Sequence, residues 1–410
     1  IFMIKNIEKI IYNLVKKNEK LKNILKYIYQ VGFSLISKKK HYVKFELSIR
    51  SKTFFGFHDK SPWSPSMNYL LGHSFEGVGN ESINSIDKVD IVLFDDKNWM
   101  RKKVIANTRS WNWQQGSQLQ WIDENRIVFN DFVNEQCVGR IINKKGENLS
   151  YTSYPIGAIS PRKNIYVSFC FKEFGNAMPG YGYNFSKNNI KSNTLQLNLI
   201  IDKLQGHDES SAKFIDCSNI GKLTLKANGK LFLSHTQFSP DGETIAFMKR
   251  LASDGKRIVS ELFLLNIITN EITQVPFYNM VSHFCFVDDN YILAYANTKG
   301  SGDGYYLVNI QTMEIKNYTK KLCIWDGHPS ASSRGEVVFD TYPDRSRHQT
   351  LFLWKGGESK AVEVAKLHAP LNFKNDCRVD LHPRISPNGE FVCFDSSFTG
   401  IRSMCVMKLK

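Results

Sequence analysis

Four histidines in the C-terminal half of the chain occupy the same place in a short repeated pattern. Each stands four residues before a turn rich in Ser, Pro, Asp, Asn or Gly, and a strand-like apolar run follows each turn. They are His235, His283, His328 and His382, at intervals of 48, 45 and 54 residues. Imidazoles can bind a divalent metal or transfer a proton. One such histidine more often anchors a turn, but four in register predict a ligand or catalytic site.

Polar side chains accompany the pattern, and these we expect to contact a substrate. Asp340 and Asp344 flank Pro343, so turn formation is the alternative explanation for both carboxylates. The expected substrate-binding residues are His58, Asp59, Lys60, Gln115, Gln118, Gln237, His328, Asp340, Asp344 and Arg384.

The segment Arg378–His382 offers a carboxylate, an imidazole and a guanidinium on one side. Asp380 and His382 are two residues apart on an extended stretch, so their side chains point the same way and can share a metal ion. Arg378 continues that face, and its planar guanidinium suits a carboxylate or phosphate.

The repeats themselves predict an all-β fold, a seven-bladed β-propeller. Weaker copies of the turn lie at Ser64, Ile122 and Ser160, which brings the total to seven. Repeats of about this length are typical of four-stranded blades around a central channel. Equivalent positions of successive blades lie on one ring, so we expect the four histidines to surround one mouth of the channel. The runs 403–408 and 41–47 are expected to pair and close the ring, which removes exposed sheet edges.

The domain boundaries follow from composition. Residues 41–410 are expected to form the propeller, with an insertion at about 171–211 where the interval between repeats is long and Gly- and Asn-rich. Residues 1–40 are expected to form a basic amphipathic helix, since apolar residues recur at helical spacing from Ile4 to Ile28.

Charge is concentrated in this N-terminal segment. Residues 1–44 hold eleven lysines and two glutamates, which is +9 of the chain's net +15. Such a helix suits an anionic membrane surface, and packing on the propeller or an oligomer contact is the equal alternative. Nucleic acid is not expected as a partner, because the rest of the chain is only mildly basic and carries no nucleic-acid motif. With no export signal and no paired-cysteine spacing, we expect a cytoplasmic protein, peripheral on the inner face of the cell membrane.

The segments at His235-Thr-Gln237-Phe-Ser-Pro, at His283 and at His382-Pro-Arg-Ile-Ser-Pro-Asn-Gly resemble the corresponding blades of oligogalacturonate lyases, chiefly over the last four blades. In that family of cytoplasmic propellers a Mn ion binds the uronate carboxylate, and β-elimination opens the 4-linked uronide. The resemblance implies His283 and His382 as metal ligands, joined here by Asp380, and a catalytic role for His235. The chain departs from the family's His-Pro-His at Asp380-Leu-His382, and Cys377 falls near the family's glutamine ligand.

The chain is also similar to propellers that accompany bacterial surface-polysaccharide genes, through the segments around His58, His328, Asp340 and Arg378. We therefore expect a carbohydrate-active enzyme, a lyase that performs metal-assisted β-elimination on a bacterial uronate-containing, capsule or O-antigen glycan. A divalent cation, most simply Mn, or Arg378 would stabilise the enolate, and His235 or Lys249 would remove the α-proton. The alternatives are a transferase that uses a nucleotide- or lipid-linked glycan precursor, and a non-catalytic scaffold for glycan assembly.

Overall fold

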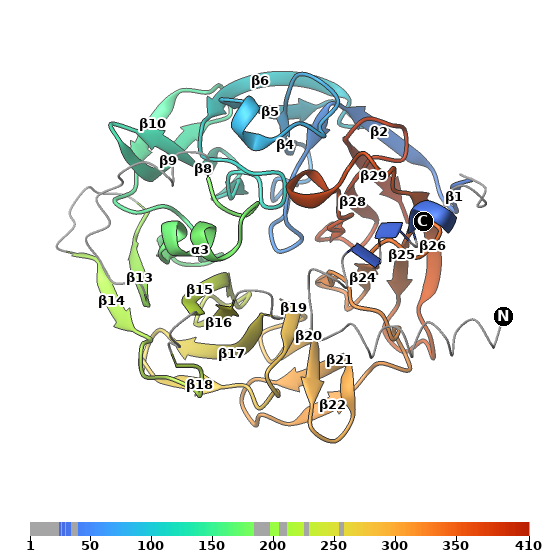
Figure 1. Cartoon of the computed structure of the whole chain (residues 1–410). Helices are drawn as coiled ribbons and strands as arrows, with labels where there is room; N and C mark the ends of the chain where they lie inside the picture. Colours follow the sequence, from blue (N-terminus) through green and yellow to red (C-terminus); the bar gives the residue numbers. More distant parts are fainter. Residues whose placement is uncertain are drawn as a thin grey trace.

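The computed structural model describes residues 24–25, 27–28, 30–33, 40–183, 197–204, 211–224, 229–253 and 258–409. Seven antiparallel sheets stand around a common centre, as in a seven-bladed propeller (Figure 1). The predicted fold is therefore confirmed for the residues that form the ring.

The first strand of each blade lies nearest the centre, and the blades follow one another along the chain. The first blade consists of β3 (Thr53–Phe54), β4 (Leu70–Ser74), β5 (Val89–Asp95) and β6 (Arg101–Thr108). The second consists of β7 (Gln120–Trp121), β8 (Arg126–Val133), β9 (Gln136–Asn143) and β10 (Asn148–Tyr151). The third consists of β11 (Ala158–Ile159), β12 (Ile165–Ser168), β13 (Asn198–Lys203) and β14 (Lys213–Asp216). The next two are β15 (Gly229–Phe238), β16 (Thr244–Ser253), β17 (Val259–Asn266) and β18 (Ile272–Gln274); β19 (Val281–Phe286), β20 (Tyr291–Thr298), β21 (Gly302–Asn309) and β22 (Ile315–Asn317).

The last two blades borrow strands from the start of the chain. They are β23 (Ser330–Ala331), β24 (Val337–Asp340), β25 (His348–Trp354) and β26 (Val362–His368) with β1 (Tyr42–Val43); and β27 (Arg384–Ile385), β28 (Phe391–Ser396) and β29 (Ser403–Lys408) with β2 (Leu47–Ser51). Short helices occur between strands, at η1 (Ile83–Ser85), α3 (Phe171–Ala177) and η4 (Asn375–Cys377).

The repeated turn has the same structure in every blade. In each, the N–H of the first turn residue donates to a carbonyl four or five residues later, over 2.8–3.0 Å. The pairs are Ser64 with Tyr69, Ile122 with Arg126, Ser160 with Ile165, Ser239 with Thr244, Val287 with Tyr291, Ser332 with Glu336 and Ser386 with Phe391. The seven copies found in the sequence thus mark the seven links between first and second strands.

Both faces of a typical blade are buried, because each sheet packs between two neighbours. On β16, Ile245 and Phe247 join one apolar cluster, whereas Ala246 and Met248 join the next. Successive side chains of a strand point to opposite faces, so a continuous apolar run suits this sandwiched position.

The ring closes through β2 rather than through the whole run predicted at 41–47. Leu47 lies opposite Met407 and Ser51 opposite Ser403, so β2 forms the outer strand of the last blade. Tyr42 and Val43 pair instead with β26, in the blade before it. The N-terminal strands therefore fasten two blades.

The first blade has an interrupted inner strand. Thr53 and Phe54 pair with β4, and Trp63 pairs again with Leu70. The residues between leave the sheet, and the blue loop that results reaches toward the middle of the ring (Figure 1). This loop carries Phe57 and His58 to the centre.

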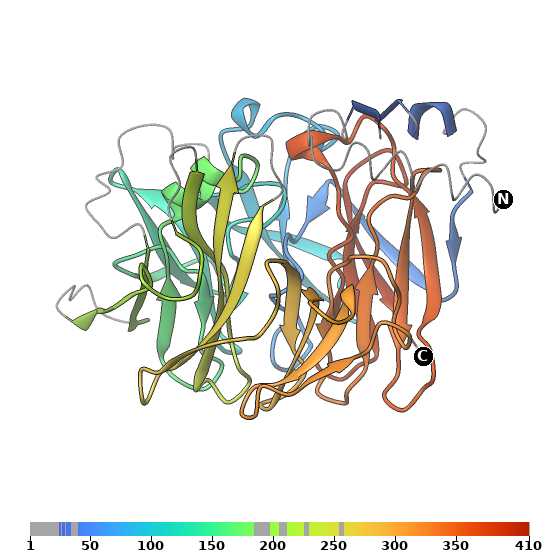
Figure 2. The ribbon, with the colours of Figure 1, turned by 60° about the horizontal axis from the view of Figure 1, so that its bottom comes forward.

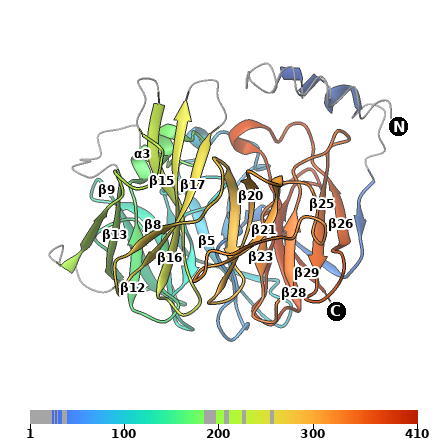
Figure 3. The same ribbon diagram turned by 90° about the horizontal axis from the view of Figure 1, so that it is seen from below.

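The predicted insertion at 171–211 is shorter at its C-terminal end. Asn198–Lys203 forms β13 and pairs with β12, because its buried apolar residues complete the third blade. The insertion thus lies between β12 and β13, and it begins with α3 on the same face of the ring as the N-terminal helical turn (Figure 2, Figure 3).

The predicted N-terminal helix falls largely outside the described residues. Residues 30–33 are helical, and buried Gln30 donates to the carbonyls of Pro343 and Asp344 at 3.4 and 3.3 Å. This portion therefore contacts the propeller, as in the packing alternative. Within the part of the chain that the structure describes, no helix is long and apolar enough to cross a membrane.

Candidate functional site

Five histidine rings surround the side chain of Phe57. They are the four predicted from the repeat and His58 from the interrupted inner strand. Their ring centroids lie 4.5 Å (His58), 4.9 Å (His382), 5.1 Å (His235), 5.9 Å (His328) and 6.1 Å (His283) from that of Phe57. The histidines therefore converge as expected, but around a phenyl ring.

Three copies of the repeat have an unusual backbone conformation at the histidine position. His235 and His382 have φ values of 57° and 43°, and Gln118, the equivalent residue of the second blade, has 57°. Residues other than glycine rarely adopt this left-handed region, and such strain tends to be retained at functional sites.

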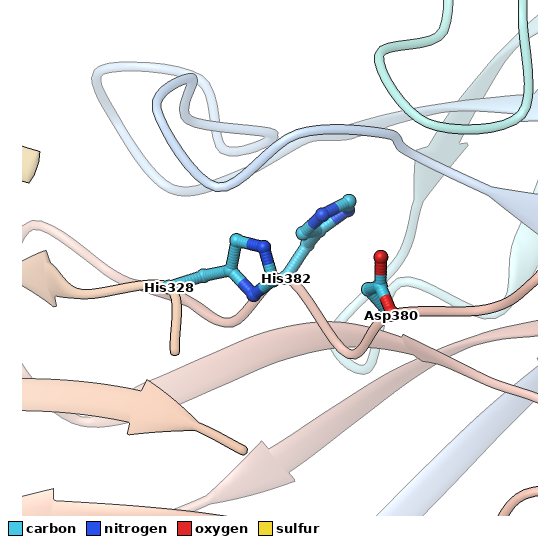
Figure 4. A group of neighbouring side chains, drawn as sticks. All are labelled: His328, Asp380 and His382. Atoms are coloured by element: carbon cyan, nitrogen blue, oxygen red, sulfur yellow. The ribbon is translucent and has the colours of Figure 1, made fainter. Parts of the chain in front are cut away.

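His328, Asp380 and His382 form a compact group of potential metal ligands. One ligand atom from each lies within 4.8 Å of the other two, and all three residues are buried. Figure 4 shows Asp380 and His382 on one stretch of chain and His328 on its neighbour. This is the only such group found among the described residues.

Asp340 orients His328. Its carboxylate accepts from the backbone N–H of His328 at 2.7 Å and from Nδ1 of the same residue at 2.8 Å. It also accepts from the backbone N–H of His382 at 3.1 Å. Gly327 permits this approach, since a Cβ there would lie 1.8 Å from the carbonyl oxygen of Asp340. Asp340 therefore supports two of the three potential ligands.

The carbonyl of Gly56 orients His382, accepting from its Nδ1 at 3.0 Å. The loop that presents this carbonyl is fixed by a buried ion pair. Arg384 donates to Gly56 O at 2.8 Å and to Asp395 at 3.1 Å, and Asp395 accepts from the N–H of Gly56 at 3.0 Å. Arg384, predicted to bind substrate, is buried, and both of its terminal nitrogens donate within this internal network, so the structure places it as a positioning residue.

The Nε2 atoms of His328 and His382 fit a metal ion. A carbonyl and a carboxylate can only accept, so Nδ1 carries the proton in both rings and Nε2 presents its lone pair. Both Nε2 atoms are buried without a hydrogen-bond partner. Two neutral imidazoles and a carboxylate suit ions such as Mn, Fe or Zn, and hydrogen-bonded Nδ1–H groups are usual in metal-bound histidines.

The pKa values of these groups are shifted by burial and by one another. Burial and the neighbouring His328 hold the pKa of His382 well below its usual value, so its ring is neutral near pH 7. Burial opposes a charged His328, but the carboxylates of Asp340, Asp380 and Asp326 together outweigh it and raise the pKa of His328. Burial opposes the charged form of Asp380, but Arg378 together with His328 and His283 outweighs it and lowers the pKa of that carboxyl.

Arg378 links the ligand group to the insertion. Its Nε donates to Asp380 at 2.8 Å and its Nη2 to the hydroxyl of Tyr181 at 2.8 Å. About a third of its side chain is exposed. Arg378 is therefore placed beside the ligand group, as predicted, and retains access to a bound molecule.

His283 is not a member of the compact group, contrary to the expected ligand set. Its ring lies 4.0 Å from that of His328, and its Nδ1 lies 3.4 Å from Asp326. His328, expected to contact substrate, takes the place expected for His283. The two residues occupy equivalent positions, and only the packing of the blades distinguishes them.

Lys249 lies apart from its predicted role. Its ammonium donates to the carbonyls of Ser218 and Ile220, both at 2.8 Å. The next residue on β16, Arg250, is the one whose charge lowers the pKa of buried His235, second to burial itself. Adjacent residues of a strand face opposite ways, so Lys249 points to the other face of β16 from Arg250.

The remaining predicted substrate contacts engage partners within the protein. Lys60 pairs with Asp59, Gln118 donates to Gln115 at 3.1 Å, and Gln237 donates to the carbonyl of Phe284 at 3.1 Å. Asp344 accepts from the N–H groups of Ser346 and His348, as the turn alternative requires. His58 Nδ1 donates to the carbonyl of Pro329 at 2.7 Å.

Three residues near the site were missed in the sequence. Tyr181, Tyr342 and Arg250 interact electrostatically with one another, and Tyr342 lies 5.5 Å from His328 between ring centroids. Two of them could have been found in the sequence, because Tyr342 is two residues from the predicted Asp340 and Tyr181 lies in the predicted insertion. Alternation along β16 was the signal for Arg250.

We expect Asp340→Asn to weaken metal binding by about 10- to 100-fold, the usual effect of losing a partner of a metal-bound histidine. An amide N–H facing Nδ1 of His328 would move the ring proton to Nε2 and block that ligand. Titration with Mn²⁺, followed by calorimetry, measures the change. Asp344→Asn is the matched control and should bind as the wild type does, and equal affinity in both variants would contradict the role of Asp340.

Comparison with known proteins supports the fold. No protein-family model matches the sequence, and no curated protein sequence matches it significantly. Among solved structures, an oligogalacturonate lyase in complex with manganese superposes with a TM-score of 0.61 at 12% identity, over 91% of this chain and 98% of that one. The tricorn protease gives a TM-score of 0.48 at 10% identity, over 91% of this chain and 34% of that one.

The β-propeller domain of the trilobed protease from Pyrococcus furiosus gives a TM-score of 0.49 at 12% identity, over 87% of this chain and 96% of that domain. At 12% identity, the match to the oligogalacturonate lyase shows a shared propeller fold and does not show a shared activity.

Proposed function

We propose that this propeller is a metal-dependent lyase that cleaves an acidic glycan by β-elimination. The observation that carries the proposal is the group His328, Asp380 and His382, with two buried Nε2 atoms that have no other partner. The lyase with the same fold was solved with manganese, which agrees with this donor set.

Three protein ligands leave coordination positions open for a substrate. A divalent ion bound there would act as a Lewis acid toward the uronate carboxylate and so favour the loss of the neighbouring proton. His328 and His382 would hold the ion through Nε2, and Asp380 through its carboxylate. Asp340 and the carbonyl of Gly56 would keep both rings in the required tautomer.

His235 is the proposed base. Burial and the charge of Arg250 hold its pKa well below the usual value, so the ring is neutral before the reaction. In the reaction the C5–H bond breaks toward His235, the C4–O bond breaks, and a C4=C5 double bond forms. The departing oxygen takes a proton from solvent or from the protonated base. Arg378, beside Asp380 and partly exposed, would pair with the carboxylate while negative charge develops on it.

A transferase acting on a phosphorylated sugar receives less support. Such an enzyme would use Arg378 and Arg384 to bind phosphate groups, and Arg384 is engaged with Asp395 and Gly56 inside the protein.

We expect metal-loaded protein to convert oligogalacturonate into unsaturated products, because elimination creates a C4=C5 bond conjugated with the carboxylate. The rise in ultraviolet absorbance measures this directly. Protein stripped by a chelator should be inactive until Mn²⁺ is returned, and a neutral galactan should give no product. A metal-loaded protein that binds oligouronides but never forms the double bond would contradict the lyase and favour a binding scaffold.

A further inference from the structure

Arg250 is a buried cation without a carboxylate partner among the residues that the structure describes. It lies on β16 with 9% of its surface exposed. Its donors contact the hydroxyl of Ser260 at 3.1 Å and the sulfur of Met178 at 3.5 Å, and no described carboxylate lies within ion-pair distance. Neither partner is charged, so no described residue forms an ion pair with this guanidinium.

The other buried arginines are compensated. Arg384 pairs with Asp395, and Arg402 donates to four backbone carbonyls at 2.8–3.4 Å. Arg50 donates to the carbonyls of Trp99 and Asn98 at 2.6 and 2.7 Å. Removing a charge from water is costly unless partners replace the lost hydration. Among the buried arginines, Arg250 thus has the weakest set of described partners for its charge.

The surroundings of Arg250 place it at the candidate site. Its partner Met178 caps the C-terminal end of α3, and Phe174 of that helix lies 6.0 Å from His235, the proposed base, and 5.8 Å from Tyr181 between ring centroids. The charge of Arg250 also acts on His235, Tyr181 and Tyr342. Arg378 acts on the same two tyrosines from the opposite part of the ring. Asp326 also interacts with Arg250, but its carboxylate is engaged with Ser282 at 2.7 Å and faces His283 at 3.4 Å.

We propose that Arg250 is a specificity-determining residue that binds an anionic group of the ligand, a carboxylate of an acidic sugar. The planar guanidinium suits a carboxylate, and a phosphate offers the same chemistry. The identity of the ligand as a uronide rests on the proposed function. The requirement for a negative charge rests on Arg250 alone.

The test compares Arg250→Met and Arg250→Lys with Arg50→Met, a buried arginine in the outer strand of the last blade. Trigalacturonate, neutral galactotriose and inorganic phosphate serve as probes, with the protein loaded with Mn²⁺. Calorimetry gives the affinity of each probe, thermal unfolding gives Tm, and elemental analysis gives metal content.

We expect Arg250→Met to bind trigalacturonate at least tenfold more weakly, Arg250→Lys to be intermediate, and Arg50→Met to bind as the wild type does. Without ligand, the Tm of Arg250→Met should equal or exceed that of the wild type, because an unneutralised charge is replaced by an apolar side chain of similar length. The Tm of Arg50→Met should fall, since two carbonyls lose their donor. Metal content should stay unchanged throughout.

Unchanged uronide affinity in Arg250→Met would overturn the proposal, as would a fall in its Tm as large as that of Arg50→Met, or its failure to fold. Equal binding of galactotriose and trigalacturonate would overturn it as well. If phosphate binds in an Arg250-dependent manner and trigalacturonate does not, Arg250 is supported as an anion-binding residue, and the uronide substrate of the proposed lyase is contradicted. If uronide binding depends on Arg250 but no unsaturated product forms, the proposed reaction fails while this assignment survives.

Discussion

Replacement of His382 by alanine is expected to remove bound metal and to lower turnover by about a thousandfold or more. A Lewis acid supplies several kcal/mol to a transition state, and each 1.4 kcal/mol is worth about tenfold in rate. His328→Ala should behave in the same way, because both rings present a buried Nε2 atom with no other partner. Elemental analysis of the purified variants and ultraviolet assays of oligogalacturonate cleavage measure the two effects.

His283→Ala is the matched control, since its ring belongs to the same cluster but not to the compact ligand group. It should retain stoichiometric metal. The fold should survive in all three variants, because the stability of the ring comes from apolar packing between blades. Full metal content in His382→Ala would contradict both this ligand set and the one first expected from the sequence, since both include His382. Loss of metal in His283→Ala with full metal content in His328→Ala would show that the ligand set is the one first expected from the sequence.

Deletion of residues 1–51, so that the chain begins at residue 52, is expected to unfold the propeller. The deletion removes β2, and with it five paired positions along β29 and the hydrogen bonds of Arg50 to the first blade. It also uncovers the apolar cluster that Leu47 and Ile49 cover. The loss should reach about 5 kcal/mol or more, which is comparable with the whole stability of many domains.

Deletion of residues 1–39 is the control, because it leaves β1 and β2 in place. We expect this shorter deletion to keep a cooperative thermal transition, with a small fall in Tm from the lost contacts of Gln30. Circular dichroism and calorimetry compare the two proteins. A well-folded protein lacking residues 1–51 would mean that closure through β2 contributes little.

Much of the architecture could be predicted from the sequence, because a propeller repeats one structural unit, the four-stranded blade. The turn at Ser239 and its six equivalents rest on a hydrogen bond between residues four or five apart, so its signature is local. The convergence of the four histidines follows as well, since equivalent positions of a ring share one radius. The insertion was overextended because β13, which has the burial of an ordinary strand, follows a segment with the composition of a loop.

The ligand set required the tertiary structure. His283 and His328 are equivalent in the repeat, and only the approach of Asp340 and of the Gly56 loop selects His328 and His382. That loop comes from more than 300 residues away in the chain, held by Asp395. Lys249 and Arg250 illustrate the same limit, because a shift of one residue along a strand changes the face on which a side chain lies.

By itself, then, the sequence determined the number of blades, the location of the turns and the ring of histidines, all of which depend on local periodicity. The tertiary structure decided which imidazoles present a free Nε2 atom, which arginine is neutralised by Asp395 and which remains uncompensated beside His235. These properties depend on hydrogen bonds and charges between segments far apart in the chain, and no local pattern records such pairings.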